Sequence, residues 1–380
     1  MIIYVFIFFL LIILSKLFSK KYTNNICFII LFIFSAIRFD VGWDFQWYYL
    51  LATKFEYFKY SIFIAKSKIL LEMNQGWEKE LGVYFTIEPL NKILYKVSWF
   101  FESPQLLITL YSFLTLFFIK KGLDYKKKKD YEIWLFFYSF PLFYFHSLNT
   151  IRQWLAISIV FFSYKYIENK KILKFVLCVL VAGLFHKTAL LVGILYFISW
   201  LNIKKEILVF LFFISFFSKD FLEKLLLLDL PIISKYKIYV LTSLGEGGRI
   251  IYFLIILLYL GILIITYLDK KFYEQNKNAI TYTCFGCFIY VALIDLGHLG
   301  PRMSEYFIVF ILYFLDDAER VVKNKFKIKK YIFILVELLF LVLLLYGDKN
   351  NIVRSQWVPY EVFFLNKDKT FHKIIKQGEK

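Results

Sequence analysis

Cysteine and histidine are scarce in this chain of 380 residues, which contains four of each. Four cysteines are too few for a disulfide scaffold. Cys27 and Cys178 lie inside apolar runs and are expected to pack as small hydrophobic side chains. Cys284 and Cys287 have the C-x-x-C spacing of zinc and redox sites, but no second pair and no nearby histidine completes a zinc set. We therefore expect these cysteines to be helix core, and we predict no metal and no cofactor.

The signatures of common soluble enzymes are also missing. The sequence has no G-x-S-x-G nucleophile elbow, no H-E-x-x-H zinc helix and no phosphate-binding P-loop. A glycine cluster at 245–248 lacks both the G-K-[ST] ending and a preceding strand. These absences exclude the best-known nucleotide, protease and hydrolase sites.

Apolar residues, by contrast, make up 60% of the sequence and aromatic residues 22%. Soluble proteins are roughly 45–50% apolar, so this chain has more apolar surface than a core can hide. The net charge is +18. A basic excess can indicate nucleic-acid binding, but here the lysines lie in short clusters between long apolar runs. This arrangement indicates a membrane protein with no nucleic-acid partner.

We predict an all-α, polytopic integral membrane protein with about twelve transmembrane helices and an outer interfacial helix, in which 1–380 form a single membrane domain. A span needs about 20 apolar residues, with a range of roughly 17–25. The first run lacks the charged start and the cleavage site of a signal peptide and is kept as a span. The apolar runs lie at about 2–17, 22–37, 104–120, 131–147, 152–168, 171–186, 188–202, 205–218, 249–268, 278–296, 304–319 and 330–346.

Lysine clusters predict the orientation, because short cytoplasmic loops collect Lys and Arg. Each cluster follows an odd-numbered run, at 16–21, 120–129, 165–174, 204–205, 270–277 and 320–330. This alternation places the N-terminus, the loop 38–103 and the tail 347–380 outside. Within that loop, 86–102 resembles an interfacial or re-entrant helix; a thirteenth span is the alternative. No cytoplasmic loop can house a nucleotide-binding domain, so the substrate must be activated already.

Arginine is rare, and five of the six arginines lie at or near the predicted outer face, against the orientation rule. A guanidinium group keeps its charge and binds phosphate or carboxylate through two parallel hydrogen bonds. We predict that an anion is bound by Arg38, Arg152 and Arg302, with Arg249 a weaker candidate. The alternative is that each arginine reaches to the interface or pairs with an acid.

The first outer cluster combines acids with aromatic residues. Asp40 and Asp44 are four residues apart and are expected to share one face of a helix, with Tyr48 one turn further. The interleaved aromatic residues are Trp43, Trp47, Tyr48 and Tyr49. Flat rings stack on the apolar faces of sugars, and carboxylates accept hydrogen bonds from hydroxyl groups, so this pattern favours sugar binding. The alternative is an aromatic belt with a helix cap at one of the acids.

Three further outer turns carry polar residues. The segment 146–154 opens a span, and its helix-start N–H groups together with Arg152 are expected to bind an anion. His186 lies in a tight turn and either shuttles a proton or is simply wetted by solvent. Arg302 and Glu305 lie one turn apart at the head of a late run, and they either contact substrate or pair with each other.

The outer clusters, taken in the order in which they occur along the chain, resemble the motifs of the EpsG family of Wzy-like polysaccharide polymerases. Residues 38–48 are similar to its R-x-x-x-G-x-D-x-x-x-Y motif, and 149–189 to its central R-Q…A…H-x-(S/T)-A region. Residues 302–307 resemble its late R-x-x-x-Y-F motif, and 357–360, expected to fold back over the mouth of the site, its closing P-Y. Trp43 replaces the family's small residue before the aspartate, which would narrow the pocket.

The resemblance implies an enzyme of the bacterial cytoplasmic membrane, with its active site facing the periplasm or exterior. Such an enzyme joins oligosaccharide repeat units carried on undecaprenyl diphosphate, and membrane lipid, a chain-length regulator and a flippase are its candidate partners. The reaction needs no metal if arginines stabilise the diphosphate leaving group. It needs a base to deprotonate the acceptor hydroxyl. Asp44 is the first choice for that base, followed by Asp40, His186 and Glu305.

Three other classes of protein stay open. A lipid-linked oligosaccharide ligase uses the same parts and differs only in its acceptor. A flippase needs charges that line a cavity through the membrane, and a secondary transporter needs paired broken helices with ions near the midplane. Charges in the middle of the runs are few, Glu337 being the clearest, which counts against transport.

Overall fold

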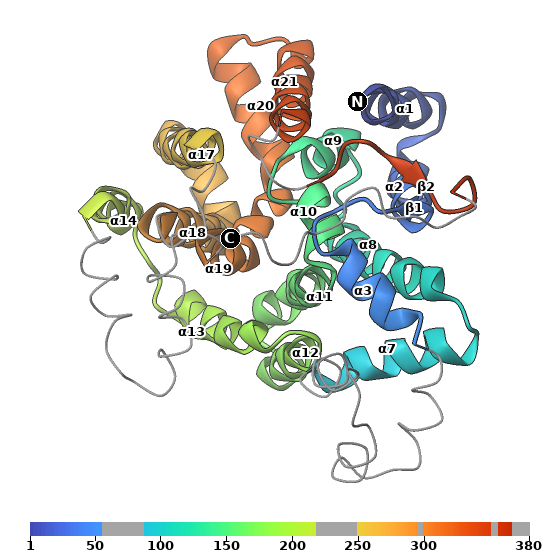
Figure 1. Ribbon diagram of the computed structural model, residues 1–380. Helices are drawn as coiled ribbons and strands as arrows, with labels where there is room; N and C mark the ends of the chain where they lie inside the picture. Colours follow the sequence, from blue (N-terminus) through green and yellow to red (C-terminus); the bar gives the residue numbers. More distant parts are fainter. Residues whose placement is uncertain (55–86, 218–248, 295–298, 351–355, 367–380) are drawn as a thin grey trace.

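The computed structural model describes residues 1–54, 87–217, 249–294, 299–350 and 356–366 (Figure 1). The regular secondary structure of these residues is helical apart from one two-stranded sheet. The first elements are α1 (Ile2–Leu17), η1 (Lys20–Tyr22), α2 (Thr23–Ala36), β1 (Arg38–Phe39), α3 (Phe45–Ala52), α7 (Pro89–Phe100), α8 (Pro104–Tyr125), α9 (Tyr131–Ser139), α10 (Tyr144–Asn149) and α11 (Ile151–Glu168). The following elements are α12 (Ile172–Phe185), η2 (Lys187–Gly193), α13 (Ile194–Trp200), α14 (Lys205–Phe217), α17 (Arg249–Leu268), α18 (Lys270–Ala292), α19 (Leu299–Ile308), η5 (Val309–Tyr313), α20 (Leu315–Phe326), α21 (Lys330–Lys349) and β2 (Glu361–Val362).

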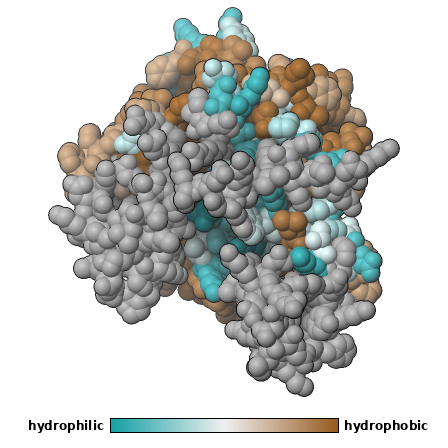
Figure 2. Space-filling model, in the orientation of Figure 1, coloured by the Kyte–Doolittle hydropathy of each residue, from teal (hydrophilic) through white to brown (hydrophobic). Residues whose placement is uncertain are grey.

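Helix α11 lies at the centre of the bundle. It is buried on nearly all sides, as expected for a helix that is apolar all round. Helices α8, α12 and α19 pack against it, and α18 packs against α19 on its outer side. Figure 2 shows hydrophilic residues in the middle of one face, between the grey segments, and mostly hydrophobic residues along its upper and side edges. A bundle with a polar centre on one face and an apolar rim suits a lipid surrounding.

The predicted all-helical fold is confirmed, and each apolar run coincides with helical structure. Three helices are long and apolar enough to cross a membrane: Pro104–Tyr125, Ile250–Leu268 and Lys330–Lys349. Shorter apolar helices lie at Ile2–Leu17, Ile172–Phe185 and Lys187–Trp200. The count of twelve crossings, the interfacial position of α7 and the outward tail stay predictions.

Three runs expected as continuous helices are broken. The run 131–147 is divided into α9 and α10, because Pro141 excludes the helical conformation for the residue before it. The run 188–202 begins with the 3₁₀ helix η2, and the run 304–319 contains the 3₁₀ helix η5 between α19 and α20. Two of these breaks, at α10 and η2, place polar residues beside the start of α11.

The lysine-rich turns meet at one end of the bundle, as their alternation predicted. Ion pairs join the turns that follow the first, third, fifth and eleventh runs. These pairs are Lys20–Asp130 at 2.5 Å, Lys126–Glu168 at 2.5 Å, Lys128–Asp316 at 2.5 Å and Lys128–Asp317 at 2.9 Å. Lys277 also donates to Asn202, which joins the turns after the seventh and ninth runs. The side of the membrane on which this end lies stays a prediction.

The described part of the tail, 356–366, folds back onto the start of the chain. Strand β2 pairs antiparallel with β1, with Arg38 opposite Val362. Trp357 is buried, and its ring N–H donates to the Phe145 carbonyl at 3.1 Å. Asp348 Oδ2 accepts the backbone N–H groups of both Trp357 and Val358 at 2.7 Å. The tail is thus anchored by burial and by hydrogen bonds to α10 and α21.

Replacing Trp357 by Ala is expected to lower the thermal unfolding temperature clearly, because it leaves a cavity worth about 3–5 kcal/mol in a typical core. The measurement is thermal unfolding of the purified protein in detergent. Trp47→Ala is the matched control, since Trp47 is 50% exposed. Equal unfolding temperatures for the two variants would contradict a buried anchor at Trp357.

Candidate functional site

At the end of the bundle opposite the lysine-rich turns, five segments bring seven ionisable side chains together. The segments are the turn before α3, the start of α7, the junction of α10 and α11, the turn between α12 and η2, and α19. We call the group the polar cluster; its members are Asp44, Glu88, His146, Arg152, His186, Arg302 and Glu305. It gathers five of the residues predicted for catalysis or diphosphate binding.

The turn that carries Asp44 depends on left-handed backbone. Gly42 has φ +106°, and a Cβ there would lie 2.7 Å from Asn149 Oδ1, so only glycine fits. The Trp43 N–H donates to the same Asn149 oxygen at 2.9 Å, and the Gly42 N–H donates to the Gln356 carbonyl at 2.9 Å. The turn is therefore held between α10 and the tail.

The prediction that Asp40 and Asp44 share a helix face is wrong. Asp40 lies before the helix with φ +49° and accepts from Gln46 Nε2 at 3.0 Å. Asp44 occupies the N-cap position of α3, where its side chain makes no capping hydrogen bond. The left-handed residues Asp40 and Gly42 turn the chain before α3 can begin, so only Asp44 reaches the cluster.

Asp44 is partly buried, and its carboxylate forms no hydrogen bond to any residue that the structure describes. Burial raises the pKa of this carboxyl above its usual value, while the charges of Arg302, Arg152 and His146 lower it in part. The burial effect is the larger. Asp44 is thus a stronger base than an exposed aspartate.

Glu88 contacts residues of three helices, and it was not predicted from the sequence as a site residue. Its Oε2 accepts from Arg152 Nη1 at 2.9 Å and from Asn91 Nδ2 at 3.1 Å, and its Oε1 lies 3.4 Å from His186 Nδ1. Burial alone would raise the pKa of Glu88, but the hydrogen bond to His186 and the charge of Arg152 outweigh it and bring the pKa to about 2. A single acid before Pro89 resembles an ordinary helix start and gave no stronger signal.

Glu305 is fully buried, with 0% of its side chain exposed. It contacts His146 Nδ1, and its Oε2 lies 3.4 Å from Gln153 Nε2. In the structure Glu305 therefore pairs with His146, and the alternative that it pairs with Arg302 is wrong. Gln153 also donates to the Arg302 carbonyl at 2.7 Å. The Arg302 guanidinium itself makes no hydrogen bond within the described ranges.

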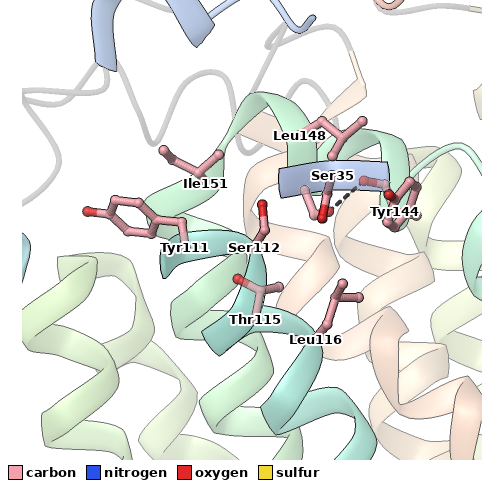
Figure 3. A pocket seen from close by; sticks show the side chains of 9 residues that line it. Ser35, Tyr111, Ser112, Thr115, Leu116, Tyr144, Leu148 and Ile151 are labelled. Atoms are coloured by element: carbon pink, nitrogen blue, oxygen red, sulfur yellow. Dashed lines mark hydrogen bonds between the residues drawn. The ribbon is translucent and has the colours of Figure 1, made fainter. Parts of the chain in front are cut away.

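Arg38 lies outside the polar cluster. It is 1% exposed, and its guanidinium donates to the Ser35 carbonyl at 2.7 Å, to Ser112 Oγ at 3.2 Å and to the Leu148 carbonyl at 3.3 Å. Ser35, Ser112 and Leu148 also line a small internal cavity, which lies where α2, α8 and α10 meet (Figure 3). Arg38 therefore joins these helices and offers no open face to a diphosphate, which corrects its predicted role.

Arg249 begins α17, but its side chain lies outside the described residues, as does the glycine cluster 245–248. Its predicted part in diphosphate binding therefore remains a prediction.

The predicted sugar-binding residues have different surroundings. Trp43 and Trp47 are exposed. Tyr48 lies beneath the Arg152 guanidinium, whose carbon is 5.7 Å from the ring centroid. Tyr49 is 3% exposed and stacks on Phe45. Tyr49 is thus a core residue, which corrects its predicted role, and the two tryptophans are the ring faces open to a ligand.

A family model for the EpsG family matches residues 21–362. No curated protein and no solved structure matches the chain. The matched range includes every member of the polar cluster and ends at the last residue of β2. The resemblance found in the motifs is confirmed: the chain belongs to the EpsG family, which is related to the Wzy-like polymerases of polysaccharides.

Proposed function

We propose that this protein is a membrane glycosyltransferase that polymerises undecaprenyl-diphosphate-linked oligosaccharide repeat units on the outer side of the cytoplasmic membrane. Its family and its apolar helices support a membrane protein of polysaccharide synthesis. The observation that carries the proposal is a carboxylate, Asp44, beside a guanidinium, Arg302, neither of which has a hydrogen-bond partner among the residues that the structure describes. Such a pair can activate a hydroxyl and hold an anionic leaving group at the same time.

The diphosphate of the donor binds to Arg302 and Arg152. Arg302 has all its N–H donors available among the described residues, whereas Arg152 gives one of them to Glu88. Guanidinium groups favour the bond-breaking step because negative charge develops on the diphosphate oxygen as it leaves. Arg302 is therefore the principal ligand of the leaving group, and Arg152 supports it.

Asp44 acts as the general base. Its carboxylate takes the proton of the acceptor hydroxyl while that oxygen attacks the anomeric carbon of the donor sugar. The bond from this carbon to the diphosphate oxygen breaks, and its electron pair leaves with the diphosphate. A base works best when its pKa lies near the working pH, and the raised pKa of Asp44 moves it in that direction.

The sugar rings lie against the indole rings of Trp43 and Trp47. Both side chains are exposed, and the two residues lie on either side of Asp44 in the sequence. The members of the polar cluster gather at one end of the bundle, which argues against a flippase or a transporter, since both need charges along a path. A ligase would use the same groups with a different acceptor, and the product of the assay below distinguishes the two enzymes.

Asp44→Asn is expected to lower the polymerisation rate by about 10²- to 10⁴-fold, because the amide cannot accept the hydroxyl proton. The measurement is ladder formation from a lipid-linked repeat unit by purified protein, without ATP or an ion gradient. Asp130→Asn, at the lysine-rich end, is the matched control. Unchanged chain lengths with Asp44→Asn would remove Asp44 from catalysis.

Arg302→Gln is expected to reduce the same rate by about 10²- to 10³-fold through loss of leaving-group stabilisation. Arg320→Gln serves as control, because Arg320 is an exposed arginine that pairs with Asp316 and Asp317 at the other end. The assignment fails if both arginine variants polymerise equally well.

Glu88 is a positioning residue, since a carboxyl with a pKa of about 2 is too weak a base near neutral pH. Its pKa is lowered by folding, so its stabilising effect is present above its ordinary value of 4.5 and is lost as the pH falls towards 2. The wild-type unfolding temperature should fall across this window, and that of Glu88→Gln should fall less. Parallel pH profiles for both proteins would show that Glu88 is not paired.

A further inference from the structure

The polar cluster contains two glutamate–histidine pairs that differ in one respect. Glu88 contacts His186 and also accepts from the Arg152 guanidinium. Glu305 contacts His146, and within the described part of the chain His146 is its one cationic partner. Glu305 therefore relies on a side chain whose charge depends on pH, whereas Glu88 has a partner that is charged at every pH.

Burial makes this dependence strong. Glu305 has no exposed surface, and an ionised carboxylate without water is costly unless a cation compensates it. The weak contact from Gln153 at 3.4 Å supplies a dipole but no charge. The Glu305–His146 pair is therefore most stable when it holds one proton between its members.

The contact to Glu305 occupies only one of the two ring nitrogens of His146. Its Nδ1 faces Glu305, so Nε2 lies on the opposite edge of the ring, and the side chain is partly exposed. A histidine held through one nitrogen by a buried carboxylate has a defined tautomer and presents the other nitrogen to a ligand. When the pair is protonated, Nε2 is a hydrogen-bond donor.

The charges of the cluster show why such a donor matters. Its carboxylates, on Asp44, Glu88 and Glu305, outnumber the two guanidinium groups of Arg152 and Arg302. With neutral histidines the cluster has one more negative than positive charge, which opposes binding of a diphosphate. Protonation of the Glu305–His146 pair removes this excess.

Other charged groups face the pair from the elements around it. Asp44 faces His146 from the turn before α3. From α18, Tyr290 lies near Glu305. Tyr138, from α9, packs against Tyr144 of α10. Among the described residues, Asp44 is therefore the charged group that faces the pair from another element, and Arg152 and Arg302 lie next to Asp44.

We propose that His146 is a third, proton-linked ligand of the diphosphate, in which the imidazolium held by Glu305 donates from Nε2 to a phosphoryl oxygen. This inference rests on the proposed function and adds that binding of the lipid-linked substrate takes up a proton. Diphosphate binding weakens as the pH rises and the pair loses its proton, which also favours release of the spent carrier at alkaline pH.

The test is calorimetric binding of inorganic pyrophosphate to the full-length protein in lipid nanodiscs at about pH 6 and about pH 8, on either side of the usual histidine pKa. The wild type should bind about tenfold more tightly at the lower pH. His146→Gln should lose this difference. His186→Gln is the matched control and should keep it, because Glu88 retains Arg152. The protonation of pyrophosphate itself is the same in all three titrations.

A second variant tests whether His146→Gln loses the pH difference merely because it misfolds. His146→Gln combined with Glu305→Gln removes both charges and should unfold at the wild-type temperature, yet bind without the pH difference. If either variant with His146→Gln keeps the full pH difference, the inference is overturned. If the wild type binds no pyrophosphate, both this inference and the proposed diphosphate site fail. If it binds as expected but makes no polymer, only the proposed function fails.

Discussion

A buried carboxylate must have a cation beside it, and this constraint shapes the functional end of the molecule. Glu88 and Glu305 reach the cluster from α7 and α19, and neither can stay ionised without the partners that α10, α11 and α12 carry. Packing of these helices and assembly of the site are therefore the same event. Once the two glutamates have taken Arg152 and the histidines, Asp44 and Arg302 are left without a hydrogen-bond partner in the part of the chain that the structure describes.

Local sequence properties predicted the helices well. An apolar run of 15 or more residues is a local signal, so helices such as α1, α2 and α21 begin within a residue of the predicted runs. The breaks at η2 and η5 were not predicted, because a 3₁₀ segment differs from an α-helix only in its hydrogen-bond spacing and leaves no trace in hydrophobicity. The break before α10 was also not predicted, although Pro141 marks it in the sequence. These breaks matter because one of them precedes His146 and aims it at Glu305.

The sequence predicted which segments carry the residues of the site, but it did not predict which of these side chains pair with one another. Motif order identified Asp44, Arg152 and Arg302, but whether an arginine is free or occupied depends on residues far away in sequence. Arg38 donates its hydrogen bonds to carbonyl groups of α2 and α10. Glu88 lies 64 residues away in the sequence from Arg152, with which it forms an ion pair. The helical placement of Asp40 and Asp44 failed for the same reason, since the left-handed turn between them is held by distant residues.

Those distant residues include the described tail, 356–366, which holds the turn that carries Asp44. The backbone carbonyl of Gln356 accepts the Gly42 N–H, and β2 pairs with β1, which leads into the turn that carries Asp44. A strand of two residues has too few hydrogen bonds to be stable alone, so β1 needs the anchors at Trp357 and Asp348 to keep its position. The family match ends at Val362, the last residue of β2, so it includes the tail residues Gln356 and Trp357 and the strand that hold the turn before Asp44.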